Sequence, residues 1–318
     1  MDRGWSFPAG FRQSVCVTQN ETTRSDEQGV DAEVLGERRH LMSLAFRMLG
    51  TVAEAEDAVQ ETYTRWYRMS EAEREQIEVP RAWLTRVAGR VCLDVLGSAR
   101  VRRERYIGPW LPEPVPATAF EAVGGDPLDR VSLDDSISTA LLVVLESMTP
   151  AERVSFVLHD VFAVPFDEVA EIVGRSAAAC RQLATSARRR VAESRKRRVP
   201  RAEHDQLVRA FALAAREGDF DALISVLDPD VVLRSDGGGI VSAARKPVFG
   251  ADRVARFILG ALSKYPTSEI LEQDTNDGLG FTMWEDGKIM GVVTLVVVGG
   301  VISDVWFVLN PDKLSMWN

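Results

Sequence analysis

Residues 166–190 read FDEVAEIVGRSAAACRQLATSARRR. Before Gly174, apolar side chains recur at the spacing of a helix face, and a glycine there can adopt the left-handed conformation that ends a helix. Ser176 can cap the helix that follows. The pattern therefore predicts two helices joined by a short turn, the arrangement of a helix-turn-helix unit.

The second helix of this pair is strongly basic in an acidic protein. Residues 175–201 contain ten Lys or Arg and a single acid, Glu193, whereas the whole chain has a formal net charge of −9. Small residues in the first turns would let the backbone approach a DNA groove, with Arg181 and Gln182 in reach of base edges and later arginines in reach of phosphates. A solvated basic face on an ordinary helical hairpin is the alternative interpretation.

Length and hydropathy limit the class of protein. At 318 residues the chain is long enough for two or three domains. No apolar stretch approaches the ~20 residues that span a bilayer. Residues 1–30 also lack the continuous apolar core of a secretory signal. We therefore expect a cytoplasmic protein without a membrane segment.

The sequence predicts neither a metal site nor a cofactor site. Its three cysteines and three histidines form no ligand cluster, and Cys92 and Cys180 fall on apolar helix positions that predict buried thiols. A GxxxxGK-type phosphate loop, a GxGxxG motif and an HExxH motif are all missing from the sequence. We expect a protein that works without a cofactor.

Changes in composition divide the chain into five parts. The polar start has no periodicity and predicts a flexible leader, and a segment rich in proline and glycine predicts a linker. The predicted parts are a leader (1–30), a first helical domain (31–106), the linker (107–127), a second helical domain (128–199) and a C-terminal domain (200–318). The expected fold is therefore multidomain.

Three helices are predicted in the first helical domain. Apolar stripes cover residues 41–49 and 52–66, with a break at Gly50, and a third stripe starts near Pro80, because proline is favoured in the first turn of a helix. The charged residues 69–79 between the last two stripes predict a loop.

The C-terminal domain changes from a helical to a β-type pattern. An amphipathic helix is followed by short runs that are typical of strands. These runs are Val231–Leu233, Gly280–Trp284, Lys288–Val298 and Val301–Leu309. Turn residues at 285–287 and at Gly299-Gly300 predict that the last three runs form hairpins, so the domain is expected to be α+β.

Three short strings and one helix face carry a family resemblance. The strings are Trp110-Leu111-Pro112-Glu113-Pro114, Asp236-Gly237-Gly238-Gly239 and Asn310-Pro311-Asp312-Lys313-Leu314, and the helix face presents Asp57, Gln60 and Glu61. With its two helical domains, the chain from residue 31 to 314 resembles the extracytoplasmic-function sigma factors of bacteria that carry a fused SnoaL-like domain, a cone-shaped α+β fold of the NTF2-like superfamily. One departure is Ile240, where that family usually has a basic residue.

The resemblance implies a promoter-recognition factor whose partners are core RNA polymerase and promoter DNA. Sigma region 2 would bind the polymerase clamp through Asp57, Gln60 and Glu61, although by spacing alone this face could simply be solvated. The minus-10 element would be contacted by Trp83, Arg86, Arg90, Arg100, Arg102 and Arg103. The minus-35 element would be read by region 4 through Ser176, Arg181, Gln182, Ser186, Arg188, Arg189 and Arg190.

The resemblance also implies that the C-terminal domain is a built-in regulator. The three strings would hold this domain against the helical domains, and a small-molecule or protein signal would shift the equilibrium between the docked and the released domain.

By its spacing with neighbouring apolar residues, Trp83 is a candidate for the core as well as for stacking on a base.

Two other interpretations remain open from the residues alone. The first is a one-component regulator that binds an operator and senses a ligand through its C-terminal domain. The second is an enzyme whose pocket is lined by Asp236, Trp284, Asp304 and Trp306, with a carboxylate as general base. No histidine accompanies these acids in the sequence, which argues against the enzyme.

Overall fold

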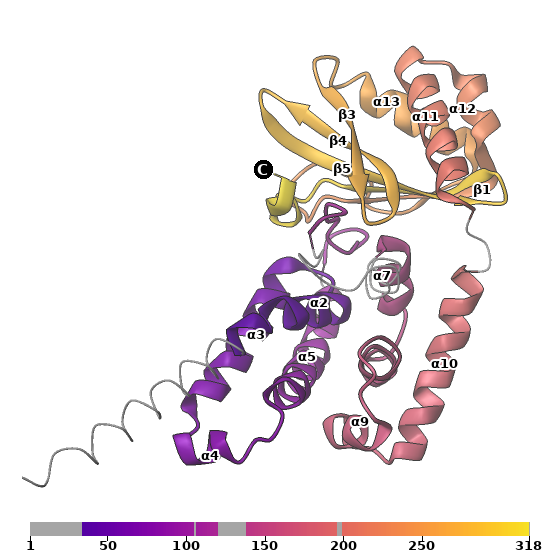
Figure 1. Cartoon of the computed structure of the whole chain (residues 1–318). Coiled ribbons are helices and arrows are strands. Elements are labelled where there is room, and N and C mark those ends of the chain that lie inside the picture. The colour runs from indigo at the N-terminus through magenta and orange to yellow at the C-terminus, as the bar shows by residue number, and fades with distance from the viewer. Residues whose placement is uncertain (1–33, 105, 120–137, 196–198, 318) are drawn as a thin grey trace, which may run out of the picture.

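The computed structural model describes residues 34–104, 106–119, 138–195 and 199–317 (Figure 1). Of residues 99–104 and 194–195 it describes the backbone alone. The predicted leader and the predicted linker beyond residue 119 lie outside this part of the chain. The helical domains form one half of the molecule and the α+β domain the other, with the first part of the linker between them.

Local signals mark several helix ends in the first helical domain. Its helices are α2 (Arg38–Leu49), α3 (Val52–Arg68), α4 (Glu71–Glu75) and α5 (Pro80–Glu104). Gly50 ends α2 with a φ of 82°, and the Thr51 hydroxyl caps α3 by accepting a hydrogen bond from the Glu54 amide at 3.3 Å. The loop predicted at residues 69–79 is partly wrong, because a reciprocal capping box between Ser70 and Glu73 starts α4 there.

The second helical domain contains the predicted helix-turn-helix. Its elements are α7 (Thr139–Glu146), α8 (Pro150–Phe156), the π-helical turn η1 (Val157–Val161), α9 (Phe166–Val173) and α10 (Ala177–Arg195). Gly174 takes the left-handed conformation with a φ of 69°, and the Ser176 hydroxyl accepts a hydrogen bond from the Ala179 amide at 3.2 Å. The predicted turn is therefore confirmed. Among the described helices, none is both long and apolar enough to cross a membrane.

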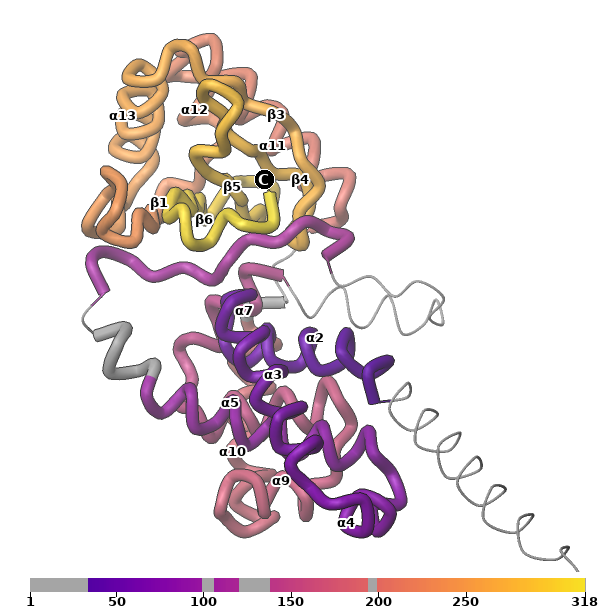
Figure 2. The backbone as a smooth tube through the Cα atoms, turned by 90° about the vertical axis from the view of Figure 1, so that its left-hand side faces the viewer, coloured from indigo at the N-terminus to yellow at the C-terminus, as the bar shows by residue number. Residues whose placement is uncertain are grey.

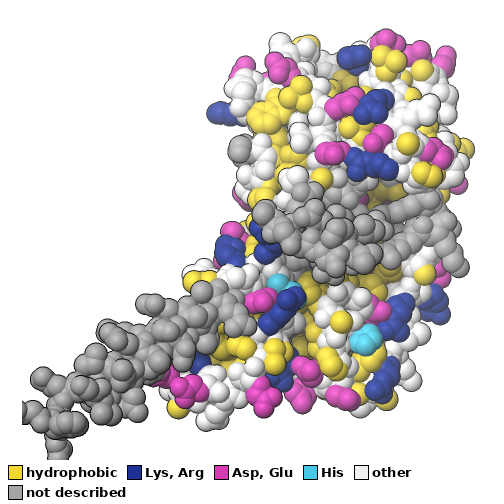
Figure 3. All heavy atoms as spheres, in the orientation of Figure 1, with side chains coloured by type: hydrophobic (Ala, Val, Ile, Leu, Met, Phe, Trp, Pro, Cys, Tyr) yellow, Lys and Arg dark blue, Asp and Glu magenta, His cyan; other side chains and the backbone are white. Residues whose placement is uncertain are grey.

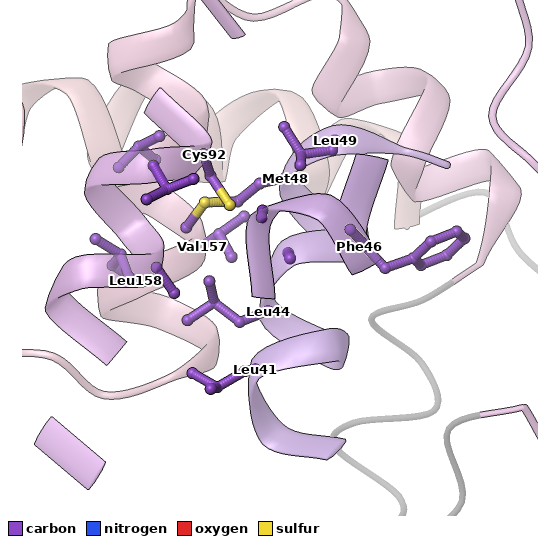
Figure 4. Close-up of a cluster of buried hydrophobic side chains, with 14 of the residues drawn as sticks. Leu41, Leu44, Phe46, Met48, Leu49, Cys92, Val157 and Leu158 are labelled. Carbon is purple, nitrogen blue, oxygen red and sulfur yellow. The ribbon is translucent and has the colours of Figure 1, made fainter. Parts of the chain in front are cut away.

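Both helical domains are built around one apolar core. Figure 4 shows Met48 and Leu44 of α2, Cys92 of α5, and Val157 and Leu158 of the second domain in one cluster. Cys92 and Cys180 are fully buried, as predicted, and burial raises the pKa of the Cys92 thiol. The two domains are thus joined by core packing as well as by the linker.

A glycine sets the distance between the two helical domains. At Gly89 of α5 an added Cβ would lie 3.1 Å from Leu158 Cδ1 and 3.6 Å from Ile172 Cδ1. A side chain there would meet packed neighbours, and glycine lets α5 approach η1 and α9 this closely without a shift of the Leu158 side chain.

The C-terminal domain is a curved sheet with helices on one face. Its helices are α11 (Arg201–Glu217), α12 (Phe220–Val226) and α13 (Ala251–Leu262). Its strands are β1 (Leu227–Asp236), β2 (Val248–Phe249), β3 (Glu269–Thr275), β4 (Gly278–Glu285), β5 (Lys288–Val298) and β6 (Val301–Val308), followed by the short 3₁₀ helices η2 (Pro311–Lys313) and η3 (Ser315–Trp317). The domain is therefore α+β, as predicted.

The sheet has the strand order β2-β1-β6-β5-β4-β3. The two predicted hairpins, β4–β5 and β5–β6, are confirmed, and β1 pairs in parallel with β6. Strands β2 and β3 were not predicted, because β2 has two residues and β3 is polar and largely exposed. Side chains alternate between the faces, so Leu233 and Phe281 pack under the helices while Trp306 and Val308 face the linker.

Residues 106–119 form a strap between the two halves of the molecule. Figure 2 shows this segment crossing beneath the sheet and above the helical domains. At its far end Pro116 pairs with Thr275, and the Ala117 amide donates to the carbonyl of Asp274 at 3.2 Å. The strap thereby extends the sheet by one bridge beyond β3.

Replacing Gly89 with leucine tests the packing between the helical domains. We expect the Gly89→Leu variant to lose about 1–3 kcal/mol of unfolding free energy, because the new side chain overpacks the contact with Leu158. Gly97→Leu is the matched control on the same helix, since a Cβ at Gly97 has no heavy atom within 4 Å among the described residues. Urea denaturation measures both, and equal stabilities would contradict this account of the contact.

Candidate functional site

The three sequence strings meet at one buried carboxylate, Asp236, at the end of β1. The side chain of Asp236 is fully buried. Its Oδ1 accepts hydrogen bonds from the Tyr106 hydroxyl at 2.6 Å and from the Gly238 amide at 3.0 Å, and its Oδ2 accepts from the Leu111 amide at 2.9 Å and from Lys313 Nζ at 2.7 Å. We call these five residues, with Asn310, the Asp236 clasp.

Lys313 is the cation of the clasp. Its ammonium group also donates to the carbonyl of Leu111 at 2.5 Å. It lies over the Trp110 ring, 4.1 Å from the centroid, and 5.2 Å from the centroid of the Tyr106 ring. A buried ion pair is stable only when hydrogen bonds and ring contacts replace the lost water, and the strap supplies both.

Asn310 and the glycine loop, residues 237–239, complete the clasp. The Asn310 amide group donates to the Tyr106 hydroxyl at 3.0 Å, and its Oδ1 accepts from the Asp312 amide at 3.1 Å. Gly238 has a φ of +63°, and a Cβ there would lie 2.5 Å from the Asn310 side chain. Only glycine satisfies both constraints at this position. Burial and the Asp236 carboxylate raise the pKa of Tyr106, so its phenol stays protonated and donates.

The next part of the strap binds the start of α3. The Glu113 carboxylate accepts a hydrogen bond from the Val52 amide at 2.7 Å, and the Glu113 amide donates to the carbonyl of Gly50 at 2.8 Å. Burial raises the pKa of Glu113, an effect that the Val52 amide opposes. Trp317 Nε1 donates to the carbonyl of Pro114 at 2.8 Å. The strap is therefore held by the first helical domain on one side and by η3 on the other.

An apolar cluster seals the contact between the halves of the molecule. Leu111 is buried with Leu314, Trp317 and residues of β5 and β6, and Ala140 of α7 packs in the same cluster. The Ala140 amide also donates to the carboxylate of Asp277 at 3.2 Å. The C-terminal domain thus contacts both helical domains, the first through the strap and the second through α7. Ile240 is 60% exposed and takes no part in the clasp.

The face of α3 that was predicted to bind polymerase is accessible. Asp57 and Gln60 are exposed and Glu61 is half-exposed, where it forms an ion pair with Arg65 at 2.9 Å. Beside them lies a groove of about 620 Å³. Its lining residues are Arg38, Glu56, Val59, Gln60, Tyr63, Thr64, Tyr67 and Arg68.

Three of the predicted minus-10 side chains on α5 contact protein in this arrangement. Trp83 is half-buried, with its ring edge against Trp66 at a centroid distance of 5.3 Å, so it packs on the core. Arg86 lies 3.7 Å from the Glu168 carboxylate, and Arg90 donates to the carbonyl of Glu171 at 3.5 Å, both on α9. The side chains of Arg100, Arg102 and Arg103 lie outside the described residues.

The predicted minus-35 contacts on α10 divide into two groups. Arg181, Gln182, Arg188 and Arg189 are exposed on one helix face, and Figure 3 shows basic side chains gathered over α10. Ser186 and Arg190 instead turn toward α8, where both contact the carboxylate of Glu152. The exposed cap residue Ser176 starts the helix. The structure thus leaves four of the seven side chains exposed on one face, where Arg188 pairs with Asp160 and Arg181 lies over the Phe166 ring.

The pocket suggested for an enzyme is not formed by the residues proposed for it. Asp236 and Trp306 point to the strap, and Asp304 forms an ion pair with Arg234 at 2.8 Å. Trp284 follows the inward-facing Met283 and so takes the opposite face. A pattern of polar and aromatic residues along strands does not show which face of each strand encloses a pocket. Among the described residues, no cluster of His, Cys, Asp and Glu could hold a metal ion.

Two family models match segments of the helical domains. The family Sigma-70 region 2 matches residues 34–105, and Sigma-70, region 4 matches residues 138–191. The chain is 42% identical over 290 residues to the ECF RNA polymerase sigma factor SigJ of Mycobacterium tuberculosis, covering 87% of this chain and 91% of that protein. It is 38% identical to the probable ECF RNA polymerase sigma factor SigI of the same species, over 92% of this chain and 97% of the relative.

The same similarity extends to a solved structure. The crystal structure of the Mycobacterium tuberculosis extracytoplasmic function sigma factor SigJ matches with a TM-score of 0.69 and 39% identity, covering 90% of this chain and 98% of that one. The match therefore includes the C-terminal α+β domain as well as the helical domains.

Removing the Asp236 carboxylate tests the clasp. We expect Asp236→Ala to lower the unfolding free energy by about 3–5 kcal/mol, because it leaves Lys313 buried without its partner charge. Asp304→Asn is the matched control, since the Asp304–Arg234 pair is partly exposed and should cost less than about 1 kcal/mol. Guanidinium denaturation followed by tryptophan fluorescence measures both. A loss for Asp236→Ala no larger than that of the control would refute the clasp.

Proposed function

The chain belongs to the extracytoplasmic-function sigma factors, and we propose that its C-terminal domain controls when the two helical domains engage polymerase and promoter. As a sigma factor, the protein binds core RNA polymerase and directs transcription initiation, and it is not an enzyme. We place it in the cytoplasm, where its polymerase partner acts. The alternative of a one-component regulator is not favoured, because relatives that match most of the chain are sigma factors.

We assign the partners to surfaces by their accessibility and charge. The exposed face of α3 with Asp57, Gln60 and Glu61 is assigned to core polymerase, and the adjoining groove offers room for a partner side chain. The exposed face of α10 is assigned to the minus-35 element, because its arginines are accessible there, although Arg188 also pairs with Asp160 and Arg181 lies over the Phe166 ring. The minus-10 element is assigned to α5.

The arrangement of α5 supports a restrained state. Arg86 and Arg90 are engaged by α9, and Gly89 lies against Leu158. Both contacts are long and partly exposed, so each is weak, and the packing at Gly89 is the stronger restraint. We infer that binding of the minus-10 element through this face is favoured when α5 moves away from the second helical domain.

A second contact holds the helical domains in the same arrangement. Arg153 of α8 donates to the carbonyl of Met48 at 2.7 Å and to the Glu146 carboxylate at 2.6 Å. The Met48 carbonyl lies in the last turn of α2, where a cation is favoured. Release of the first domain from the second would break this contact as well.

The observation that carries the proposal is the burial of Asp236 among groups from the strap. Leu111 and Tyr106 belong to the segment that leaves α5, whereas Asp236 and Lys313 belong to the C-terminal domain. When the strap is fixed, the chain segment that connects α5 to the second helical domain is held at its start. A signal that weakens the clasp would release this segment. A 100-fold excess of restrained over released molecules corresponds to about 2.7 kcal/mol.

Run-off transcription with purified core RNA polymerase tests the restraint. We expect Asp236→Ala to produce at least about tenfold more promoter-specific transcript than the unchanged chain, because loss of the clasp frees the strap. Asp304→Asn should match the unchanged chain. A lower transcript yield from Asp236→Ala, with circular dichroism showing that it is folded, would mean that the domain assists initiation, and the restraint would be wrong.

Two arginines on α10 distinguish base reading from phosphate binding. We expect Arg181→Ala to reduce discrimination between minus-35 sequences by about 1–3 kcal/mol, because it removes a base-edge contact. Arg189→Ala should weaken binding to all promoter sequences equally. It should also lower the slope of log affinity against log salt concentration by about one. Binding of the polymerase holoenzyme to promoter variants over a salt series measures both. If Arg181→Ala lowered the affinity for all promoter variants equally, the assignment of Arg181 to a base-edge contact would be wrong.

A further inference from the structure

The C-terminal domain encloses a cavity of about 450 Å³ on the sheet face opposite the strap. We call it the cone cavity. It is lined by Ser235, Val241, Ser242, Ala243, Ala244, Arg256, Phe257, Gly260, Ala261, Lys264, Tyr265, Ser268, Met283, Met290, Phe307 and Leu309. Most of these side chains are apolar, and the volume lies within the range of small-molecule sites in proteins.

One polar group in this wall is buried without a partner. Ser235 is 1% exposed, and its hydroxyl forms no hydrogen bond with any described residue. Strand alternation turns Ser235 to the same face as Leu233, away from the strap that its neighbour Asp236 binds. A buried hydroxyl without a partner costs about 1–3 kcal/mol. A ligand oxygen at this point would remove that cost.

The remaining polar groups of the cavity favour an acidic ligand. Lys264 lines the cavity, is exposed and forms no ion pair within the described part of the chain. Arg256 is already paired with Asp252 at 3.0 Å. Among the described lining residues there is no Asp or Glu. The unpaired charge of the cavity is therefore positive.

From these observations we propose that the cone cavity binds an apolar small molecule with a carboxylate at one end and a hydroxyl or carbonyl oxygen elsewhere on its body. The carboxylate pairs with Lys264 at the mouth. The second oxygen hydrogen-bonds to the hydroxyl of Ser235. The apolar body packs on Phe257, Met283 and Phe307.

A second cavity in the same domain lacks these features. It has a volume of about 340 Å³ and shares Met283 and Phe307 with the cone cavity. Its charged lining includes Glu272 paired with Arg209 at 3.2 Å, and no buried unpartnered hydroxyl is found among its described lining residues. We therefore place the ligand in the cone cavity.

The wall of the cone cavity is continuous with the clasp. Ser235 precedes Asp236 in β1, and Leu309, another lining residue, donates its amide to the carbonyl of Asp236 at 2.7 Å. The segment 241–244 follows the glycine loop, and the Val241 amide donates to the carbonyl of Gly237 at 3.1 Å. A ligand that moves this wall would move the partners of Asp236. This coupling rests on the proposed function, whereas binding itself does not.

Isothermal titration of the full chain, without polymerase or DNA, tests the binding. The probes are ω-hydroxydecanoate, decanoate and decane diol. We expect ω-hydroxydecanoate to bind, and decanoate to bind about fivefold more weakly because it lacks the oxygen that reaches Ser235. Decane diol should also bind more weakly because it lacks the carboxylate that pairs with Lys264. The loss should be only about fivefold, since an exposed ion pair contributes little. Absence of binding by ω-hydroxydecanoate would overturn the proposal.

Four variants locate the site. Gly260→Leu should weaken all three probes at least about tenfold, because a Cβ at Gly260 meets no described atom within 4 Å and the new side chain enters the cavity. This variant replaces a helical glycine and should remain folded. Ser235→Ala should equalise ω-hydroxydecanoate and decanoate. Lys264→Ala should equalise ω-hydroxydecanoate and the diol, whereas the control Lys288→Ala should not.

Two further outcomes overturn parts of the inference. Unchanged binding to Gly260→Leu would place the probes elsewhere. Equal affinity of the unchanged chain for all three probes would refute the ligand class. Hydrogen exchange at the Leu111 amide, which donates to Asp236, tests the coupling. We expect its rate to change at least about threefold on binding, and an unchanged rate with bound probe would refute the coupling alone.

Discussion

The buried pair of Asp236 and Lys313 is the constraint on which the arrangement of this molecule depends. A carboxylate that is removed from water must receive hydrogen bonds on both oxygens, and here the donors come from the strap, from the glycine loop and from η2. Two of these donors belong to the C-terminal domain and two to the strap. The same requirement therefore fixes the strap to the sheet and, through Glu113, fixes the start of α3 to the strap.

The end of strand β1 serves two surfaces at once. Because successive side chains point to opposite faces, Asp236 binds the strap while Ser235 lines the cone cavity. A displacement of Ser235 in the cavity wall therefore acts directly on Asp236, the next residue of the same strand. The cavity and the clasp are also joined by Leu309, whose amide binds the carbonyl of Asp236. Because the cavity and the clasp are adjacent, coupling between them requires no long pathway of intervening residues.

Local signals predicted much of the fold, and tertiary packing decided the rest. Gly174 and Ser176 mark the helix-turn-helix in the sequence because the turn geometry requires those residue types. The three strings predicted a contact between distant segments, but not that Asp236 would be its centre. Nor could spacing along α10 show that Ser186 and Arg190 turn to Glu152, since that choice depends on how α8 packs. A basic helix face in the sequence is therefore wider than the face left open after folding.

The order of the clasp residues along the chain has a consequence for synthesis. Tyr106 and Leu111 leave the ribosome long before Asp236, and Lys313 follows last of these. Because domains fold in the order in which they emerge, the helical domains are complete before their restraint can form. In the proposed mechanism, a newly made molecule is in its least restrained state while it is still being translated, and proteolytic loss of residues 310–314 would return a finished molecule to that state.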